Sequence, residues 1–166
     1  MPIFLKILFS CIFFITYPNL DISYYAILNE KYYLVVVDNY INDDFGNRGL
    51  SYNCIKIFKD ITLTQQFCFN VNAIIKIVDK MPFFTIETLQ QNRIGETTNT
   101  YLTFQLINDK FYLYQYSKKE WHMYKDKEAI DNIFIYYRQP RDLQNKKLIL
   151  LDNVNDELLQ NLEESK

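Results

Sequence analysis

The sequence predicts a mainly β domain, built as an antiparallel sandwich or barrel with a short C-terminal helix. Fourteen Tyr and thirteen Phe, together with many Ile and Val, are side chains that suit a pleated, half-buried surface. About eight or nine short stretches alternate apolar and polar residues between polar turns. The 166 residues suffice for one domain with a core. The alternative is an α+β fold, in which a curved sheet packs on a helix.

The first residues have the pattern of an export signal. Lys6 precedes an apolar run at residues 7–15. A membrane-spanning helix needs about 20 apolar residues, so this run has the length of a signal-peptide core instead. We expect residues 1–20 to be a signal peptide that is cleaved between residues 16 and 23. Residues 24–166 then form a periplasmic or secreted domain without a transmembrane span. An uncleaved anchor and a buried first strand are the alternatives.

Two cysteines remain once the predicted signal, with Cys11, is removed. In an oxidising compartment, Cys54 and Cys68 are expected to form a disulfide. Two buried thiols are the alternative. The two residues lie symmetrically about Ile61, so a direct cross-strand bridge requires a loop with an odd number of residues. Without a nearby histidine or a second cysteine pair, the spacing is not that of a zinc site, and no metal is expected.

The first half of the domain reads as a series of strands. They are expected at residues 31–37, 52–58, 65–71, 73–78 and 83–89. Residues 38–49 are polar, contain two of the three glycines and are expected to form a loop. The second and third strands form a hairpin with the two cysteines in its arms, and Pro82 marks a turn or a sheet edge.

A second hairpin is predicted at residues 99–119, with Asn108 and Asp109 as a two-residue turn. Its register pairs Leu106 with Phe111, Phe104 with Leu113 and Leu102 with Gln115. This places one side of the hairpin in the core: Leu102, Phe104, Leu106, Phe111 and Leu113. On the other side, Gln105 is expected opposite Tyr112, Thr103 opposite Tyr114, and Tyr101 opposite Tyr116. This half-polar set of tyrosines, Thr103 and Gln105 would line a solvated or partner-facing surface.

Two further strands and a helix complete the expected fold. The strands are predicted at residues 132–138 and 146–152. Residues 153–166 have the pattern of a short amphipathic helix, with Asn153 or Asn155 as its N-cap. Its apolar stripe consists of Val154, Leu158, Leu159 and Leu162.

The chemistry-bearing residues do not form a catalytic signature. His122 is the only histidine, and no motif that presents a nucleophile accompanies it. No glycine-rich phosphate loop is present, so no cofactor is expected. The net charge of −2, without a basic run, argues against nucleic acid as a partner. We therefore expect a protein that is not an enzyme.

Two groups of aromatic residues are candidates for contact with a partner. Trp121, His122 and Tyr124 lie between lysine-rich segments, as in an interface hot spot, and equally as in an apolar plug beneath a loop. The second group is the face of Tyr112, Tyr114 and Tyr116. Tyrosines on one side of an antiparallel sheet serve cross-strand packing more often than recognition.

One segment, Gly95 to Tyr116, resembles a group of small uncharacterised exported proteins of Gram-negative bacteria. The positions that carry the resemblance are Gly95, Thr97, Thr98, Thr100, Tyr101, Phe104, Phe111 and Leu113. The resemblance implies a periplasmic β domain, and domains of this size and compartment are similar to periplasmic immunity proteins and hydrolase inhibitors.

The leading functional hypothesis is a non-enzymatic periplasmic binding domain, in the manner of an immunity protein or hydrolase inhibitor. Its partner would be a toxin or a wall hydrolase, and the acidic balance of the chain suits a basic enzyme cleft. A carbohydrate- or cell-wall-binding module, with a wall glycan as ligand, is the second hypothesis. An envelope protein of structural role is the third.

Overall fold

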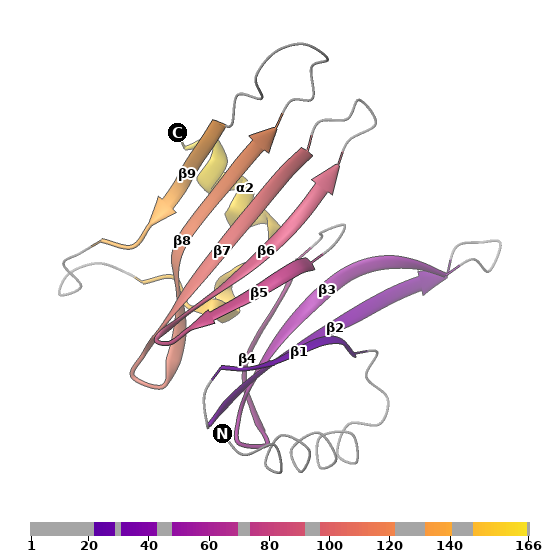
Figure 1. Cartoon of the computed structure of the whole chain (residues 1–166), viewed down its shortest axis with the longest axis vertical. Helices are drawn as coiled ribbons and strands as arrows, with labels where there is room; N and C mark the ends of the chain where they lie inside the picture. The colour runs from indigo at the N-terminus through magenta and orange to yellow at the C-terminus, as the bar shows by residue number, and fades with distance from the viewer. Residues whose placement is uncertain are drawn as a thin grey trace.

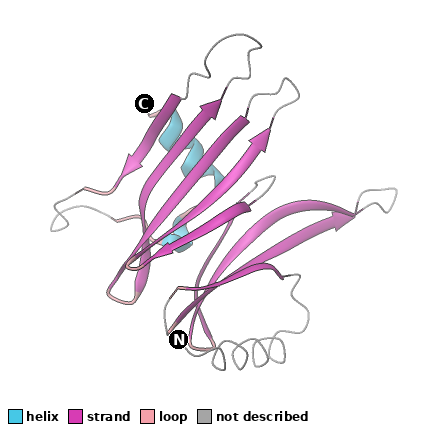
Figure 2. Ribbon diagram, in the orientation of Figure 1, coloured by secondary structure: helices cyan, strands magenta, loops and turns pink. Residues whose placement is uncertain are grey.

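The computed structural model describes residues 22–28, 31–42, 48–69, 74–91, 97–121, 132–140 and 148–165. Within them the protein is mainly β, with two antiparallel sheets and a short C-terminal helix (Figures 1 and 2). The predicted fold class, a β-sandwich with a C-terminal helix, is confirmed. The sheets share one core, so each buries one face against the other.

The described strands follow one another as two meanders. Sheet A has the order β1 (Ile22–Ile27), β2 (Tyr32–Asn42), β3 (Arg48–Lys59) and β4 (Thr62–Phe69). Sheet B has the order β5 (Ile74–Lys80), β6 (Phe83–Gln91), β7 (Thr97–Ile107), β8 (Lys110–Trp121) and β9 (Asn132–Arg138). A single 3-10 turn, η1 (Leu151–Asn153), and helix α2 (Asp156–Glu164) follow. Within each sheet, every strand pairs with its neighbour in sequence, which short turns permit only between antiparallel strands.

Two expectations about strand positions are wrong, and one strand is additional to those predicted. Strands β2 and β3 extend across most of the predicted 38–49 loop, because their ladder continues past a bulge as far as the pairing of Asn42 with Arg48. Strand β1 was not predicted. The strand predicted at 146–152 is absent from the described residues there: Leu150 makes an isolated bridge to Tyr112, and the chain then turns as η1. Leu151 is fully buried at this turn, so the apolar residues serve packing instead of pairing.

The core between the sheets is aromatic. The Phe84 ring stacks on Phe104 with centroids 5.1 Å apart and meets Phe111 edge-on at 5.0 Å. The ring centroid of Phe67, in sheet A, lies 5.3 Å from that of Phe104, in sheet B. This contact joins the two sheets. Leu102, Phe104, Phe111 and Leu113 are fully buried and Leu106 packs against them, so the predicted core side of the second hairpin is confirmed. Aromatic pairs in this geometry add to the stability gained from burial.

The buried side chain of Gln65 also joins the two sheets. Its Oε1 accepts from the Phe111 backbone N–H at 2.6 Å, and its Nε2 donates to the Phe111 carbonyl at 3.2 Å. The same Nε2 donates to Asp152 at 3.1 Å, which fixes η1 beside β4. The amide thus satisfies backbone groups of β8 that would be costly to bury without partners.

Cys54 and Cys68 form a disulfide, as predicted, and are direct cross-strand partners with Cα atoms 4.1 Å apart. The β3–β4 turn, however, has two residues and not the odd number expected, and an unbroken ladder from it would place Cys54 opposite Phe67. A bulge inserts Thr64 between the pairs of Ile57 and Phe58. This extra residue shifts the register by one and brings the cysteines together.

The β7–β8 turn is the predicted Asn108–Asp109 pair. Both residues have positive φ, 48° and 64°, which two-residue hairpin turns require and which Asn and Asp tolerate. The Asp109 carboxylate accepts from the Tyr32 hydroxyl at 2.7 Å and from Lys59 Nζ at 2.6 Å. Lys59, followed by Tyr32, holds the pKa of Asp109 below its usual range. These contacts fasten the tip of the hairpin to sheet A.

Of the two predicted N-cap residues, Asn153 and Asn155, it is Asn155 that caps helix α2. The Asn155 side chain accepts from the Leu158 backbone N–H at 2.8 Å, which satisfies one of the donors left unpaired at a helix start. Leu159 is buried, and Leu158 and Leu162 are partly buried against the core. The apolar stripe therefore directs α2 toward the inner face of sheet B, beside sheet A.

Candidate partner-binding surface

The tyrosines of β8 are divided between the two faces of sheet B. The predicted register holds from the turn as far as Phe104, which pairs with Leu113. A bulge then inserts Tyr114, so Leu102 pairs with Tyr116 and Thr103 with Gln115. The expected pairs of Leu102 with Gln115, Thr103 with Tyr114, and Tyr101 with Tyr116 are wrong. A one-residue shift moves every later side chain to the opposite face.

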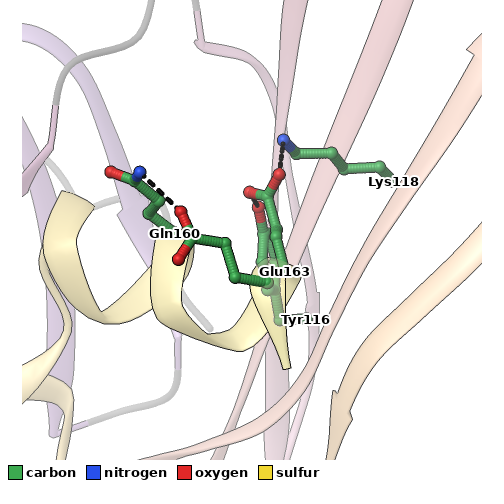
Figure 3. Close-up of polar contacts among 5 residues, drawn as sticks. Tyr116, Lys118, Gln160 and Glu163 are labelled. Carbon is green, nitrogen blue, oxygen red and sulfur yellow. Dashed lines mark hydrogen bonds and ion pairs between the residues drawn. The ribbon is translucent and has the colours of Figure 1, made fainter. Parts of the chain in front are cut away.

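Tyr116 is consequently a core residue and leaves the set of surface candidates. It is 1% exposed, and its hydroxyl donates to the Glu163 carboxylate of α2. The other oxygen of Glu163 accepts from Lys118 Nζ at 2.7 Å (Figure 3). Burial, followed by the Glu163 contact, raises the pKa of the Tyr116 hydroxyl, so it remains a donor. The cluster attaches α2 to the inner face of sheet B.

Tyr112 and Tyr114 stay on the opposite side, which we name the outer face of sheet B. The centre of this face consists of Phe83, Thr85, Glu87, Asn99, Tyr101, Thr103, Gln105, Tyr112, Tyr114 and Gln115, all partly exposed. The strands β6 to β8 supply them by simple alternation away from the core. Aromatic and uncharged polar groups dominate this centre, where Glu87 is the single carboxylate, whereas Lys76, Lys119 and Arg138 pair with residues of the same face and border it.

Contacts within the outer face of sheet B hold its side chains in place. The hydroxyls of Thr85 and Thr103 are 2.9 Å apart across β6 and β7. The Glu87 carboxylate accepts from the Asn99 amide at 3.0 Å. The Tyr114 ring meets Phe83 edge-on, with centroids 4.9 Å apart. These cross-strand pairs order the surface before any partner arrives, which lowers the entropic cost of binding.

The outer face of sheet B ends at an exposed apolar corner. Trp121, at the end of β8, is 41% exposed, and Ile133 of β9 is 67% exposed. Ile133 pairs with Lys119, two residues before Trp121, so Ile133 and Trp121 are diagonal neighbours on the same face. Lys119 Nζ lies 4.7 Å from the centre of the Trp121 ring. We name Trp121 and Ile133, with the exposed Phe134 on the other face of β9, the β8–β9 corner.

Of the predicted candidates, Tyr112, Tyr114 and Trp121 share one face of β8, but Tyr112 and Tyr114 lie in its first half and Trp121 lies at its end. His122 and Tyr124 lie outside the described residues. Sequence reasoning missed Ile133 and Phe134, although the run "NIFIYYR" beside Trp121 in a meander signals an apolar strand end.

In the described ranges, no group of three or more His, Cys, Asp or Glu side chains is placed to hold a metal ion. The helices in those ranges are too short or too polar to span a bilayer. No protein-family model, curated protein or solved structure matches this chain.

Proposed function

We propose that this protein is a non-enzymatic binding domain whose partner is another protein. The observation that carries the proposal is the outer face of sheet B with the β8–β9 corner at its end. This surface has the layout of an interface, since tyrosines are enriched at its centre and charged side chains such as Lys76, Lys119 and Arg138 lie around it. Trp121 and Ile133 are the candidate anchors because both are large, apolar and exposed. A few such side chains commonly carry most of the binding energy of an interface.

The disulfide supports a place outside the cytoplasm, because thiols are kept reduced in the cytosol. A periplasmic or secreted immunity protein, or an inhibitor of a toxin or wall hydrolase, is the finer form of the proposal. Its support is the net charge of −2, which suits steering toward a basic enzyme cleft.

A protein partner is favoured over a wall glycan by the surroundings of Trp121. A ring that stacks on a sugar presents one flat face, whereas Lys119 Nζ lies over the Trp121 ring at 4.7 Å. Tyr114 likewise contacts Phe83 edge-on. Because Trp121 and Tyr114 already contact Lys119 and Phe83, their rings fit a protein interface of mixed composition better than a glycan site, in which exposed ring faces stack on sugars.

The test is a comparison of three variants of the oxidised protein as bait for envelope and secreted fractions of its own organism. Trp121→Ala and Ile133→Ala remove the anchors of the β8–β9 corner. Ile61→Ala is the matched control, because Ile61 is 54% exposed at the β3–β4 turn, away from this surface. A stoichiometric protein partner is expected, with affinity reduced about 30-fold or more by Trp121→Ala and several-fold by Ile133→Ala.

Each other outcome has a distinct meaning. A partner bound equally by the parent and all three variants would refute this choice of surface. Sedimentation of the parent with peptidoglycan or polysaccharide, without a protein partner, would replace the proposal by the wall-binding function. The parent and Ile61→Ala must bind with equal affinity, since only then can a loss of affinity in Trp121→Ala or Ile133→Ala be assigned to the β8–β9 corner.

A further inference from the structure

The outer face of sheet B carries more positive than negative charge among the described residues. On β5, Lys76 and Lys80 lie opposite Glu87 and Phe83 of β6, on the side away from the buried Ile77. The same pairing and alternation across the sheet give this face the cations Lys76, Lys80, Lys110, Lys119 and Arg138 and the anion Glu87. All of these side chains are partly or fully exposed.

Glu87 offsets one of these positive charges at most. It lies opposite Lys76, and its carboxylate also accepts from the Asn99 amide at 3.0 Å. Lys119, which lies over the Trp121 ring, is not needed for the excess, because the other four cations already outnumber Glu87. The outer face of sheet B is therefore cationic, although the net charge of the chain is −2.

The cations surround the tyrosine-rich centre of the face. Lys76 and Lys80 lie on the edge strand β5, and Arg138 lies on the opposite edge strand β9. Lys110 begins β8 at the β7–β8 turn, and Lys119 lies near the end of the same strand. The area that they frame extends about 20 Å across the five strands and about 30 Å along β8. This is comparable to the roughly 800 Å² that one partner contributes to a specific protein interface.

Arg138 is held in a position to bind a carboxylate. Its Nε and Nη2 donate to Gln115 Oε1 at 3.2 Å and 2.8 Å. Because these bonds use Nε and Nη2, the N–H groups of Nη1 remain for a further acceptor. A guanidinium that is already oriented loses less conformational entropy when a partner's carboxylate binds, and such charge-assisted hydrogen bonds are among the strong ones.

We propose that the partner contacts the outer face of sheet B through an acidic surface, with carboxylates opposite the framing cations and uncharged groups opposite the tyrosines. This inference rests on the proposed protein-binding function and specifies the chemistry of the partner. The net charge of −2 acts on the approach of a partner from a distance, whereas the charges on the face decide what it contacts. A partner that is steered by the net charge must therefore still offer carboxylates to this face.

The arrangement of the cations favours a protein over a nucleic acid. A single strand of nucleic acid is bound along a cationic groove that follows its backbone. The cations of sheet B instead enclose an uncharged centre, as the charged rim of a protein interface does. The Cys54–Cys68 disulfide, which supports a place outside the cytoplasm, points the same way.

The test measures binding of the oxidised protein to a short polyglutamate peptide at about 0.1 M salt, where charges more than about 10 Å apart are screened. Polylysine and oligodeoxythymidine of the same length are the comparisons. Polyglutamate is expected to bind and to shift the NMR signals of β6 to β8. The double substitution Lys76→Glu with Lys110→Glu is expected to weaken this binding about 10-fold. The control, Lys31→Glu with Lys56→Glu, changes the net charge equally but lies in sheet A or beside it, and is expected to weaken binding less than about twofold.

The proposal is overturned if polyglutamate does not bind, if polylysine binds this face more tightly, or if both double variants lose affinity equally, since net charge alone would then govern binding. Tighter binding of oligodeoxythymidine would assign the face to nucleic acid instead. The captured protein partner gives a separate readout. If its affinity falls with Trp121→Ala but not with Lys76→Glu and Lys110→Glu, this inference fails and the proposed function stands. If polyglutamate binds the face but no protein partner is captured, the proposed function fails and the carboxylate-binding face stands.

Discussion

Removal of one hydroxyl tests the register of the β7–β8 hairpin. The Tyr116 hydroxyl donates to Glu163, whereas Tyr112, four residues earlier in β8, lies partly exposed on the outer face of sheet B. The substitutions Tyr116→Phe and Tyr112→Phe delete the same atom from the same strand. Only the first removes a contact between sheet B and helix α2.

The expected magnitude follows from the partners of Glu163. A hydrogen bond to a charged group contributes about 1.5–3 kcal/mol to stability. The Glu163 side chain is 31% exposed and retains its ion pair with Lys118 after the substitution, so it does not become an uncompensated buried charge. We therefore expect the lower end of that range, about 1.5 kcal/mol, for Tyr116→Phe. Tyr112→Phe is expected to change stability by less than about 0.5 kcal/mol, as is usual at surface positions.

Urea unfolding of the oxidised protein, followed by circular dichroism, measures both changes. The midpoint is expected to fall for Tyr116→Phe without a change in slope, because the same surface is exposed on unfolding. Equal midpoints for the two variants would show that Tyr116 does not lie beneath α2. That result would refute the bulge at Tyr114 as the feature that separates the tyrosines.

Three further perturbations have defined outcomes. Joint replacement of Cys54 and Cys68 by Ala is expected to lower the free energy of unfolding by about 3 kcal/mol, because the disulfide closes a loop of about 15 residues. Urea midpoints of the parent should fall with reductant while those of the double variant stay constant. Asn155→Ala is expected to cost about 1 kcal/mol through loss of the α2 N-cap, measured in the same way. Lys59 and Tyr32 lower the pKa of Asp109, so the ionised carboxylate stabilises the folded protein. This contribution is fully present above the ordinary pKa of 3.8 and is lost as the pH falls through the lowered pKa of the folded state. Asp109→Asn should therefore unfold more readily than the parent at neutral pH, and a pH series of urea midpoints in which this difference does not close in acid would contradict the assignment.

The bulge at Tyr114 also gives the candidate binding surface its composition. Without it, Tyr116 would join Tyr112 on the outer face of sheet B, and Gln115 would point into the core. The bulge instead keeps Gln115 at the surface, where its side-chain Oε1 accepts a hydrogen bond from Arg138 Nη2 at 2.8 Å. One inserted residue in β8 therefore places Tyr116 on the buried face of the sheet and Gln115 on its polar face.

Much of the fold follows from the sequence because local signals agree. Alternation predicted the positions of β4 to β9 closely, and Asn108 and Asp109 predicted the hairpin turn by their tolerance of positive φ. Asn155 ahead of an apolar stripe predicted the start of α2. The pair of cysteines predicted the disulfide from compartment and count.

The tertiary structure decided which face each side chain occupies. A bulge is stabilised by packing across the sheet. It has no signature in a run such as "FYLYQY", because tyrosine suits a buried face and a solvent-exposed face equally. The same holds for Thr64, whose insertion aligns the cysteines, and for Leu151, whose burial turns a predicted strand into η1. Local periodicity therefore specified the elements, whereas contacts between residues distant in sequence set the registers and so the composition of the candidate surface.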